Sequence, residues 1–288
     1  MKSKKHQSIL YRILVASLLL VSPALASTET KPDKVVVYKE IGGVELNLYV
    51  FEPDGHKASD QRPAIVFFFG GGWMGGTPEQ FYQQAEKFAE HGYVAMAADY
   101  RVISKHKTTP FECVKDGKSA IRWVRQHAKE LGIKPDKIIA AGGSAGGHVA
   151  ACTGVIVGHE EASDNLEISS RPNAMILFNP VIDTTEKGYG LSKVGKARKT
   201  DISPTHQVIK GIPPTLIFHG TADTAVPFEN VERFTALMKK AGNQCTLVPF
   251  DGKGHGFFNG SSFRAKSSDL DFDLTMKKSL EFLEALGY

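Results

Sequence analysis

A single serine, Ser144, stands in a context that favours nucleophilic chemistry. It is the middle residue of Ala-Gly-Gly-Ser-Ala-Gly-Gly at 141–147, which follows an apolar run at 137–141 and precedes residues 148–151. The run predicts a strand, and the residues after the motif predict the start of a helix. A serine flanked by glycines between a strand and a helix sits in a strained turn that exposes its hydroxyl. We therefore expect Ser144 to attack an acyl carbon.

A glycine run could stabilise the charge that such an attack creates. Residues 63–69 form a short apolar run typical of a buried strand, and Gly-Gly-Gly-Trp-Met-Gly-Gly follows at 70–76. Glycines directly after a strand allow backbone N–H groups to point at one spot, which is how an oxyanion hole is built. The alternatives are a flexible loop or a phosphate-binding loop. A Walker loop would end in Gly-Lys-Ser/Thr, which this run lacks.

An acid and a base complete the predicted site. Asp223 and His255 each lie in a loop just past a predicted strand, and glycines flank His255. Ligands bind at the carboxyl ends of parallel strands, so we expect both loops to meet the turn that carries Ser144. We predict that His255 is the general base and that Asp223 orients it. His219 is the competing base, and His148 is expected to be structural.

The order of the predicted elements indicates an α/β fold. Strands and helices alternate along most of the chain, which favours a mostly parallel sheet with helices on both faces. Two β-rich segments around Gly42-Gly43 predict an antiparallel hairpin near the N-terminus. The predicted strands are 35–41, 44–51, 64–69, 93–98, 137–142, 174–179, 215–219 and 245–250, and the predicted helices are 78–91, 111–131, 145–157, 228–241 and 270–286.

These motifs resemble those of the α/β-hydrolase superfamily. Within it, the chain is similar to the compact esterases related to the hormone-sensitive-lipase group and to bacterial acetylxylan and feruloyl esterases. The chain order Ser, Asp, His is the α/β-hydrolase order. The residues that carry the resemblance are 70–73, 99–101, 142–147, 219–223 and 254–257.

The resemblance implies an α/β-hydrolase fold and a role for each site residue. Ser144 would be the nucleophile, His255 the general base and Asp223 its orienting acid. Neither a metal nor an organic cofactor is expected, and the three cysteines are expected to be buried free thiols. The N–H donors of the oxyanion hole would be those of Gly71, Gly72 and Ala145.

Two departures separate the chain from the lipase-like branch. Phe69 precedes the glycine run where the family usually has histidine, so the loop must be braced differently. Residues 102–105, Val-Ile-Ser-Lys, follow Asp-Tyr-Arg where the hormone-sensitive-lipase group continues with Leu-Ala-Pro-Glu. The carbohydrate-esterase branch is therefore favoured.

The expected function is that of a serine carboxylesterase acting on short acyl esters. The substrate would be a small molecule or a polysaccharide, such as acetyl or feruloyl esters of plant or algal glycans. Trp73, Met74 and Phe257, with Phe258 beside them, are expected to offer the substrate an apolar and stacking surface. The alternatives are a peptidase related to the prolyl oligopeptidase hydrolase domain, a generic short-chain carboxylesterase or lipase, and a non-catalytic binding module.

The N-terminus predicts export. Residues 1–26 combine a basic start, a short apolar stretch and the small-residue site Ala24-Leu25-Ala26, which is the pattern of a signal peptide. Its apolar core is too short to cross a bilayer, so we expect a secreted or periplasmic protein without stable membrane insertion. Residues 27–288 are predicted to be one α/β-hydrolase domain. Removing the four basic residues of 1–26 lowers the formal charge from +4 to about zero, which argues against a nucleic-acid partner.

Residues 183–212 are the longest stretch without a predicted element, and they lie where a lid would be. Long loops inside a compact domain are usually functional. We consider two interpretations: a basic rim for an anionic substrate, such as a uronic-acid-bearing glycan, and an ordinary solvated loop. The basic residues concerned are Lys187, Lys193, Lys196, Arg198 and Lys199.

Overall fold

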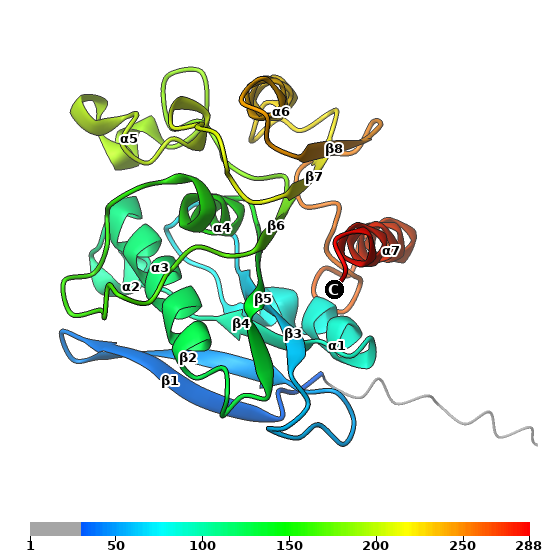
Figure 1. The fold of residues 1–288 in the computed structure, drawn as a ribbon. Helices are drawn as coiled ribbons and strands as arrows, with labels where there is room; N and C mark the ends of the chain where they lie inside the picture. The colour runs from blue at the N-terminus through cyan, green and yellow to red at the C-terminus, as the bar shows by residue number, and fades with distance from the viewer. Residues whose placement is uncertain (1–29) are drawn as a thin grey trace, which may run out of the picture.

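The chain is organised by an eight-stranded sheet with the order β1-β2-β4-β3-β5-β6-β7-β8 (Figure 1). The computed structural model describes residues 30–288, so the predicted signal peptide lies outside the described residues. The β1–β2 and β2–β4 pairs are antiparallel, and every other neighbouring pair is parallel. The predicted mostly parallel sheet with an antiparallel N-terminal hairpin is confirmed.

The strands are β1 (Lys34–Ile41), β2 (Val44–Phe51), β3 (Arg62–Phe68), β4 (Val94–Ala98), β5 (Ile133–Gly143), β6 (Ala174–Phe178), β7 (Thr215–Gly220) and β8 (Cys245–Phe250). The helices are η1 (Pro78–Phe81), α1 (Tyr82–Glu90), α2 (Ile103–His106), α3 (Pro110–Gln126), α4 (Ala145–Val155), α5 (Leu191–Val194), η2 (Lys196–Arg198), η3 (Pro204–His206), α6 (Phe228–Lys240) and α7 (Asp269–Ala285).

Helices cover both faces of the sheet. Helices α3 and α4 pack on one face, while α1 and α7 lie on the other (Figure 1). Every residue of β4, β6 and β7 is buried, because these strands are covered on both sides. The sequences of β4 and β6 are therefore continuously apolar instead of alternating, while β7 also buries Thr215 and His219. None of the helices in residues 30–288 is both long and apolar enough to cross a membrane.

Helix α2 was not predicted, β5 begins four residues before the predicted strand, and two further segments differ from the sequence prediction. Helix α3 begins at Pro110, where Thr109 and Glu112 form a capping box, and it ends at Gln126, five residues before the predicted end at 131. Residues 127–132 instead form a turn that leads directly into β5. The second difference is in 183–212, predicted to be irregular, which contains the short helices α5, η2 and η3.

Candidate active site

The turn that carries Ser144 joins the end of β5 to the start of α4. Ser144 has φ 56° and ψ −120°, a backbone conformation that non-glycine residues rarely adopt. Its N–H donates to the carbonyl of Phe178 at 2.9 Å, which fixes the turn against β6. Helix α4 passes so close to β3 that a Cβ at Gly146 would lie 2.0 Å from the carbonyl oxygen of Phe68. Glycine at 146 is therefore required for the turn to close.

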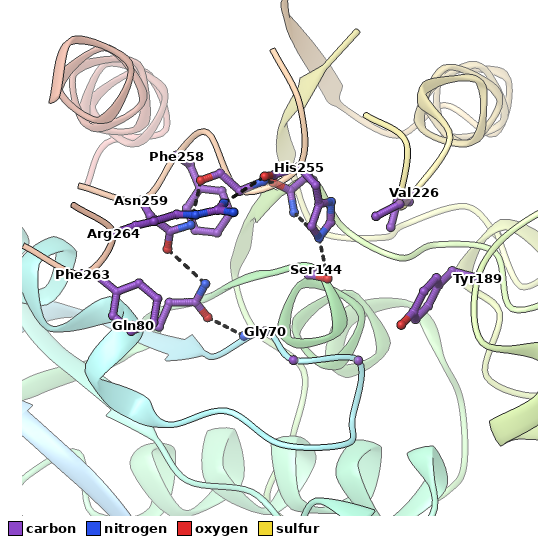
Figure 2. A pocket seen from close by; sticks show the side chains of 15 residues that line it. Gly70, Gln80, Ser144, Tyr189, Val226, His255, Phe258, Asn259, Phe263 and Arg264 are labelled. Atoms are coloured by element: carbon purple, nitrogen blue, oxygen red, sulfur yellow. Dashed lines mark hydrogen bonds between the residues drawn. The ribbon is translucent and has the colours of Figure 1, made fainter. Parts of the chain in front are cut away.

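Ser144, His255 and Asp223 form one chain of hydrogen bonds (Figure 2). The Ser144 Oγ lies 2.9 Å from His255 Nε2, and His255 Nδ1 lies 2.7 Å from Asp223 Oδ2. The Asp223 side chain is fully buried, whereas 28% of the His255 side chain is exposed. This arrangement can move a proton from the serine hydroxyl to the imidazole while the carboxylate fixes the tautomer of the ring.

The carboxylate of Asp223 is held in its ionised form. Its Oδ1 accepts hydrogen bonds from the N–H groups of Ala225 and Val226, each at 2.9 Å. Burial would raise the pKa of Asp223, but the hydrogen bonds from His219 and His255 outweigh it and hold that pKa well below its usual value. A permanent negative charge is thus placed behind the ring of His255.

The two other candidate histidines have different environments. His219 is buried, and its Nε2 lies 2.9 Å from the carbonyl of Val226 and 3.2 Å from Asp223 Oδ2. It therefore braces the loop that carries Asp223, and the histidine that is hydrogen-bonded to Ser144 is His255. His148 is also buried, and its Nε2 lies 2.7 Å from the carbonyl of Ile202. Burial lowers the pKa of His148 to about 4, so it is neutral at pH 7.

Three backbone N–H groups close to Ser144 in the chain or in the cavity lining lack an acceptor of their own. Within residues 30–288, no protein acceptor receives the N–H groups of Gly71, Gly72 or Ala145. Gly71 has φ +126°, and a Cβ there would lie 2.1 Å from the carbonyl oxygen of Gly75. Gly71 and Gly72 line the same cavity as Ser144, and Ala145 directly follows the serine at the first turn of α4. These donors have the chemistry of an oxyanion hole.

The glycine loop is braced without the histidine that the family usually has at position 69. The ring of Phe69 stacks on that of Tyr100, with 4.2 Å between centroids. The Tyr100 hydroxyl donates to the carbonyl of Phe69 at 2.6 Å. Arg101, the next residue, forms a bidentate ion pair with the buried Asp116. The Asp-Tyr-Arg segment thus anchors the start of the glycine loop to the core.

A relay of amide side chains joins the glycine loop to the loop of His255 (Figure 2). The Gly70 N–H donates to Gln80 Oε1 at 2.6 Å, and Gln80 Nε2 donates to Asn259 Oδ1 at 3.0 Å. Asn259 Nδ2 in turn donates to the carbonyl of Gly256 at 2.7 Å. The relay therefore ties the predicted oxyanion loop to the residue that follows the base.

Neither the relay nor one further amide is predicted from the sequence. Asn179, which follows β6, accepts a hydrogen bond from the Gly256 N–H at 3.1 Å, and its Nδ2 lies 3.5 Å from His255 Nε2. Its position just past the carboxyl end of a strand could have marked Asn179 as a site residue in the sequence. Gln80 and Asn259 carry no comparable signal, because they are 179 positions apart in the sequence.

A cavity of about 380 Å³ opens beside Ser144 and His255. Aromatic, amide and small side chains form most of its wall. Residues lining it are Gly70, Gly71, Gly72, Gln80, Ser144, Asn179, Tyr189, Ala225, Val226, His255, Gly256, Phe258, Asn259, Phe263 and Arg264.

Three residues predicted to line the substrate pocket lie outside this lining. Trp73 is fully buried, and its ring meets that of His148 edge-on at 5.0 Å. Met74 is 43% exposed on the surface, and Phe257 packs against Phe250. Of the predicted aromatic residues, only Phe258 lines the cavity. Neighbouring residues in these irregular loops point in different directions, so sequence proximity to the site does not determine which ones reach the cavity.

The basic residues of 183–212 do not form a rim around the cavity. Tyr189 is the one residue of this segment that lines it. Lys193 Nζ donates to the carbonyl of Gly72 at 3.0 Å and lies over the ring of Tyr189. Lys199 pairs with Glu186, and Arg198 pairs with Asp201. The segment is therefore a covering element attached to the glycine loop, in place of the basic rim that we considered.

Comparison with known proteins places this geometry among esterases. The BD-FAE family model matches residues 48–199, and the dienelactone hydrolase family model matches residues 174–282. The structure of Thermogutta terrifontis esterase 2 phosphoramylated by tabun is 50% identical, with a TM-score of 0.85, and the match covers 90% of this chain and 97% of that one. The propionate-bound structure of the same esterase is 49% identical, with a TM-score of 0.84, and the match covers 90% and 96% of the two chains.

The curated relatives are more distant and longer. An acetylxylan esterase of Xylanibacter ruminicola is 29% identical over 214 residues, which are 70% of this chain and 42% of that protein. The chain spans about half the length of the curated relatives that it matches.

Proposed function

Because the chain belongs to the BD-FAE family of α/β-hydrolase serine esterases, we propose that it hydrolyses short-chain acyl esters carried on carbohydrate. The observation that supports this most is the hydrogen-bonded chain Ser144, His255 and Asp223 beside an open cavity. Carboxylic ester hydrolysis is also the function named for its relatives, among them an acetylxylan esterase and Thermogutta terrifontis esterase 2.

The proposed reaction follows from the positions of these groups. Ser144 Oγ attacks the ester carbonyl while His255 Nε2 takes the hydroxyl proton. The negative charge on the carbonyl oxygen is received by the N–H groups of Gly71, Gly72 and Ala145, which we assign as the oxyanion hole. One such donor typically contributes about 3–4 kcal/mol to the transition state.

The second half of the reaction uses the same groups. His255 gives its proton to the leaving alcohol, and Ser144 stays bound to the acyl group as an ester. Water then gives its proton to His255 and attacks that ester, and the acid leaves as Ser144 regains its proton. Asp223 remains ionised throughout, which its low pKa supports.

A short acyl group on a sugar suits the cavity better than a fatty chain. The cavity has a volume of about 380 Å³, and amide and glycine residues interrupt the aromatic part of its wall. Each additional CH₂ gains about 0.8 kcal/mol only where an apolar surface receives it. The propionate-bound structure of the Thermogutta esterase supports a short acyl group for this chain as well, and the Xylanibacter relative supports an acetylated glycan.

The test is a profile of kcat/KM against acyl length, together with release of acetate from acetylated xylan. We expect the profile to peak at about two to four carbons and to fall beyond about eight. Ser144→Ala should abolish hydrolysis while the far-UV circular dichroism spectrum is retained. A profile that rises through twelve carbons, with a jump when the substrate forms micelles, would mean a lipase and would remove the carbohydrate proposal.

We also propose that the protein is exported and begins at Ser27 after cleavage. The proposal rests on the sequence pattern of residues 1–26. N-terminal sequencing of protein from the periplasm or culture medium tests it. A chain that retains Met1 would contradict it.

A further inference from the structure

We propose that Arg264 makes this esterase selective for substrates that carry a carboxylate near the scissile ester, such as acetylated uronic acids or half-esters of diacids. The inference rests on the proposed esterase activity and adds to it a charge preference and the residue responsible. Arg264 lies in the loop between β8 and α7, 120 positions after the serine whose cavity it helps to line.

Arg264 is the one formally charged residue in the wall of this cavity. The other lining residues within 30–288 are glycines, aromatic and small apolar residues, two asparagines, a glutamine, the serine and His255. The wall holds no acidic side chain, and the ionised Asp223 lies behind the ring of His255, so Arg264 gives its own part of the cavity a positive potential. A substrate carboxylate beside Arg264 therefore meets one cationic partner.

The Arg264 side chain is exposed, and most of the donors of its guanidinium are unused. Its Nη1 donates to the carbonyl of His255 at 3.1 Å. It also lies against Gly256, where a Cβ would be 2.5 Å from Nη1. No acidic side chain within residues 30–288 pairs with it, so its other N–H groups have no protein acceptor there. A guanidinium has five donors in a planar fork that fits a carboxylate with two hydrogen bonds.

The neighbouring residue provides a surface for the rest of such a substrate. Phe263 is 47% exposed, and it lines the cavity next to Arg264. In Figure 2 these two side chains lie on one side of Ser144, while Tyr189 and Val226 lie on the other. One half of the cavity thus combines an aromatic face with a cation, which suits a sugar ring or aromatic ring that bears a carboxylate.

The basic residues of 183–212 do not compete for this role, because none of them lines the cavity. Anion selection is thus assigned to a single residue, and it can be tested by charge removal at one position. Lys266 is the matched control. It is an exposed cation of the same loop, two positions away, and it does not line the cavity.

The experiment measures kcat/KM for two pairs of esters that differ in one carboxylate. An acetylated methyl glucuronoside against the corresponding glucoside places the charge on the alcohol, and phenyl hydrogen succinate against phenyl butyrate places it on the acyl group. Each pair is measured with the wild type and with Arg264→Gln, Arg264→Lys and Lys266→Gln. The pair that responds to Arg264 identifies the part of the substrate that carries the anion.

We expect Arg264→Gln to lower the anionic-to-neutral ratio of kcat/KM by about 10-fold in at least one pair, because a charge-assisted hydrogen bond is lost. Arg264→Lys should retain part of the ratio, and Lys266→Gln should change it by less than about 2-fold. Raising the salt concentration should reduce the wild-type ratio, because the pair is open to solvent.

Two outcomes would overturn the proposal. One is an unchanged ratio in Arg264→Gln for both pairs. The other is an equal loss for charged and neutral esters, which would mean that Arg264 only tethers the loop through the His255 carbonyl. Failure of the proposed esterase activity is distinct from both, because the wild type would then hydrolyse neither the neutral nor the charged esters.

Discussion

Two segments cover the active-site edge of the sheet, and they differ in what their side chains do. The insertion, residues 183–212, carries most of the nearby cations, yet it supplies only Tyr189 to the cavity. The C-terminal loop, residues 251–268, is mostly exposed beyond Asn259, and it supplies six residues to the cavity wall, including His255 and Arg264. The insertion is richer in charged residues but mainly supports the site, whereas the C-terminal loop supplies residues expected to contact the substrate or react with it.

The difference follows from how each segment is anchored. The insertion is bound to the core by buried contacts, among them His148 to the Ile202 carbonyl and Thr205 to the Ile182 carbonyl. Its lysines are drawn to local partners, as Lys193 is to the carbonyl of Gly72. The C-terminal loop also has local pairs, such as Lys253 with Asp271 and Ser261 with Asp269, but its His255 and Arg264 line the cavity. Net charge in a loop therefore does not indicate a ligand site unless the position of each charge is known.

The largest loss of activity is expected when the general base, His255, or its partner Asp223 is replaced. His255→Ala should lower kcat by about 10⁴ or more, and Asp223→Asn by about 10⁴, because the first removes the base and the second disturbs its tautomer. His219→Ala should cost far less, since His219 contacts the carboxylate and the loop but not Ser144. Steady-state kinetics on a short acyl ester measures all three. If His219→Ala is the most damaging at equal stability, His255 is not the base.

The next effect tests the insertion as a scaffold. Burial lowers the pKa of His148 from 6.5 to about 4. The unfolded chain binds more protons than the folded chain between these values, so the free energy of unfolding falls as pH drops through this window. The full loss is about 3 kcal/mol at 1.36 kcal/mol per pH unit.

His148→Gln can still donate to the carbonyl of Ile202, but it cannot be protonated. We therefore expect urea unfolding between pH 7 and pH 4 to show a steeper loss of stability in the wild type than in this variant. Parallel loss in both proteins would show that His148 does not link the insertion to pH.

A smaller effect is expected from the relay that joins the two sides of the cavity. Gln80→Ala removes the acceptor of the Gly70 N–H and the contact with Asn259, so the glycine loop is less well positioned. We expect kcat to fall by about 10-fold with little change in KM, less than the loss of an oxyanion donor itself. Asn259→Ala keeps the Gly70 contact and should be milder. An increase in KM alone would indicate a role in substrate binding instead of positioning.

The smallest effect is expected from the exposed cations of the insertion. Lys187→Gln and Lys196→Gln should change the kcat/KM for a uronate ester by less than about 2-fold, because neither side chain lines the cavity and exposed charges are screened. The comparison with Arg264→Gln on the same substrate sharpens the contrast between the two segments. A loss at Lys187 or Lys196 that equals the loss at Arg264 would restore the basic-rim interpretation.

The sequence by itself determined the fold class and the residues of the predicted triad. Local rules carry that information, since a glycine-flanked serine after a strand, and an acid and a histidine just past later strands, require one edge of a parallel sheet. The boundaries of α3 and β5 and the short helices of 183–212 were not determined in this way, because caps, turns and tertiary contacts decide where elements end.

Only the tertiary structure decided which other side chains reach the cavity. Trp73 and Met74 are adjacent in the glycine loop, yet one is buried under the insertion and the other is exposed. Gln80, Asn259 and Arg264 join the site because loops from distant parts of the chain meet at the ends of β3 and β8. The direction of the backbone in an irregular loop is set by packing against neighbouring segments, and no periodic pattern in the sequence records it. The residues that line the pocket could therefore not be derived from the sequence, although those of the predicted triad could.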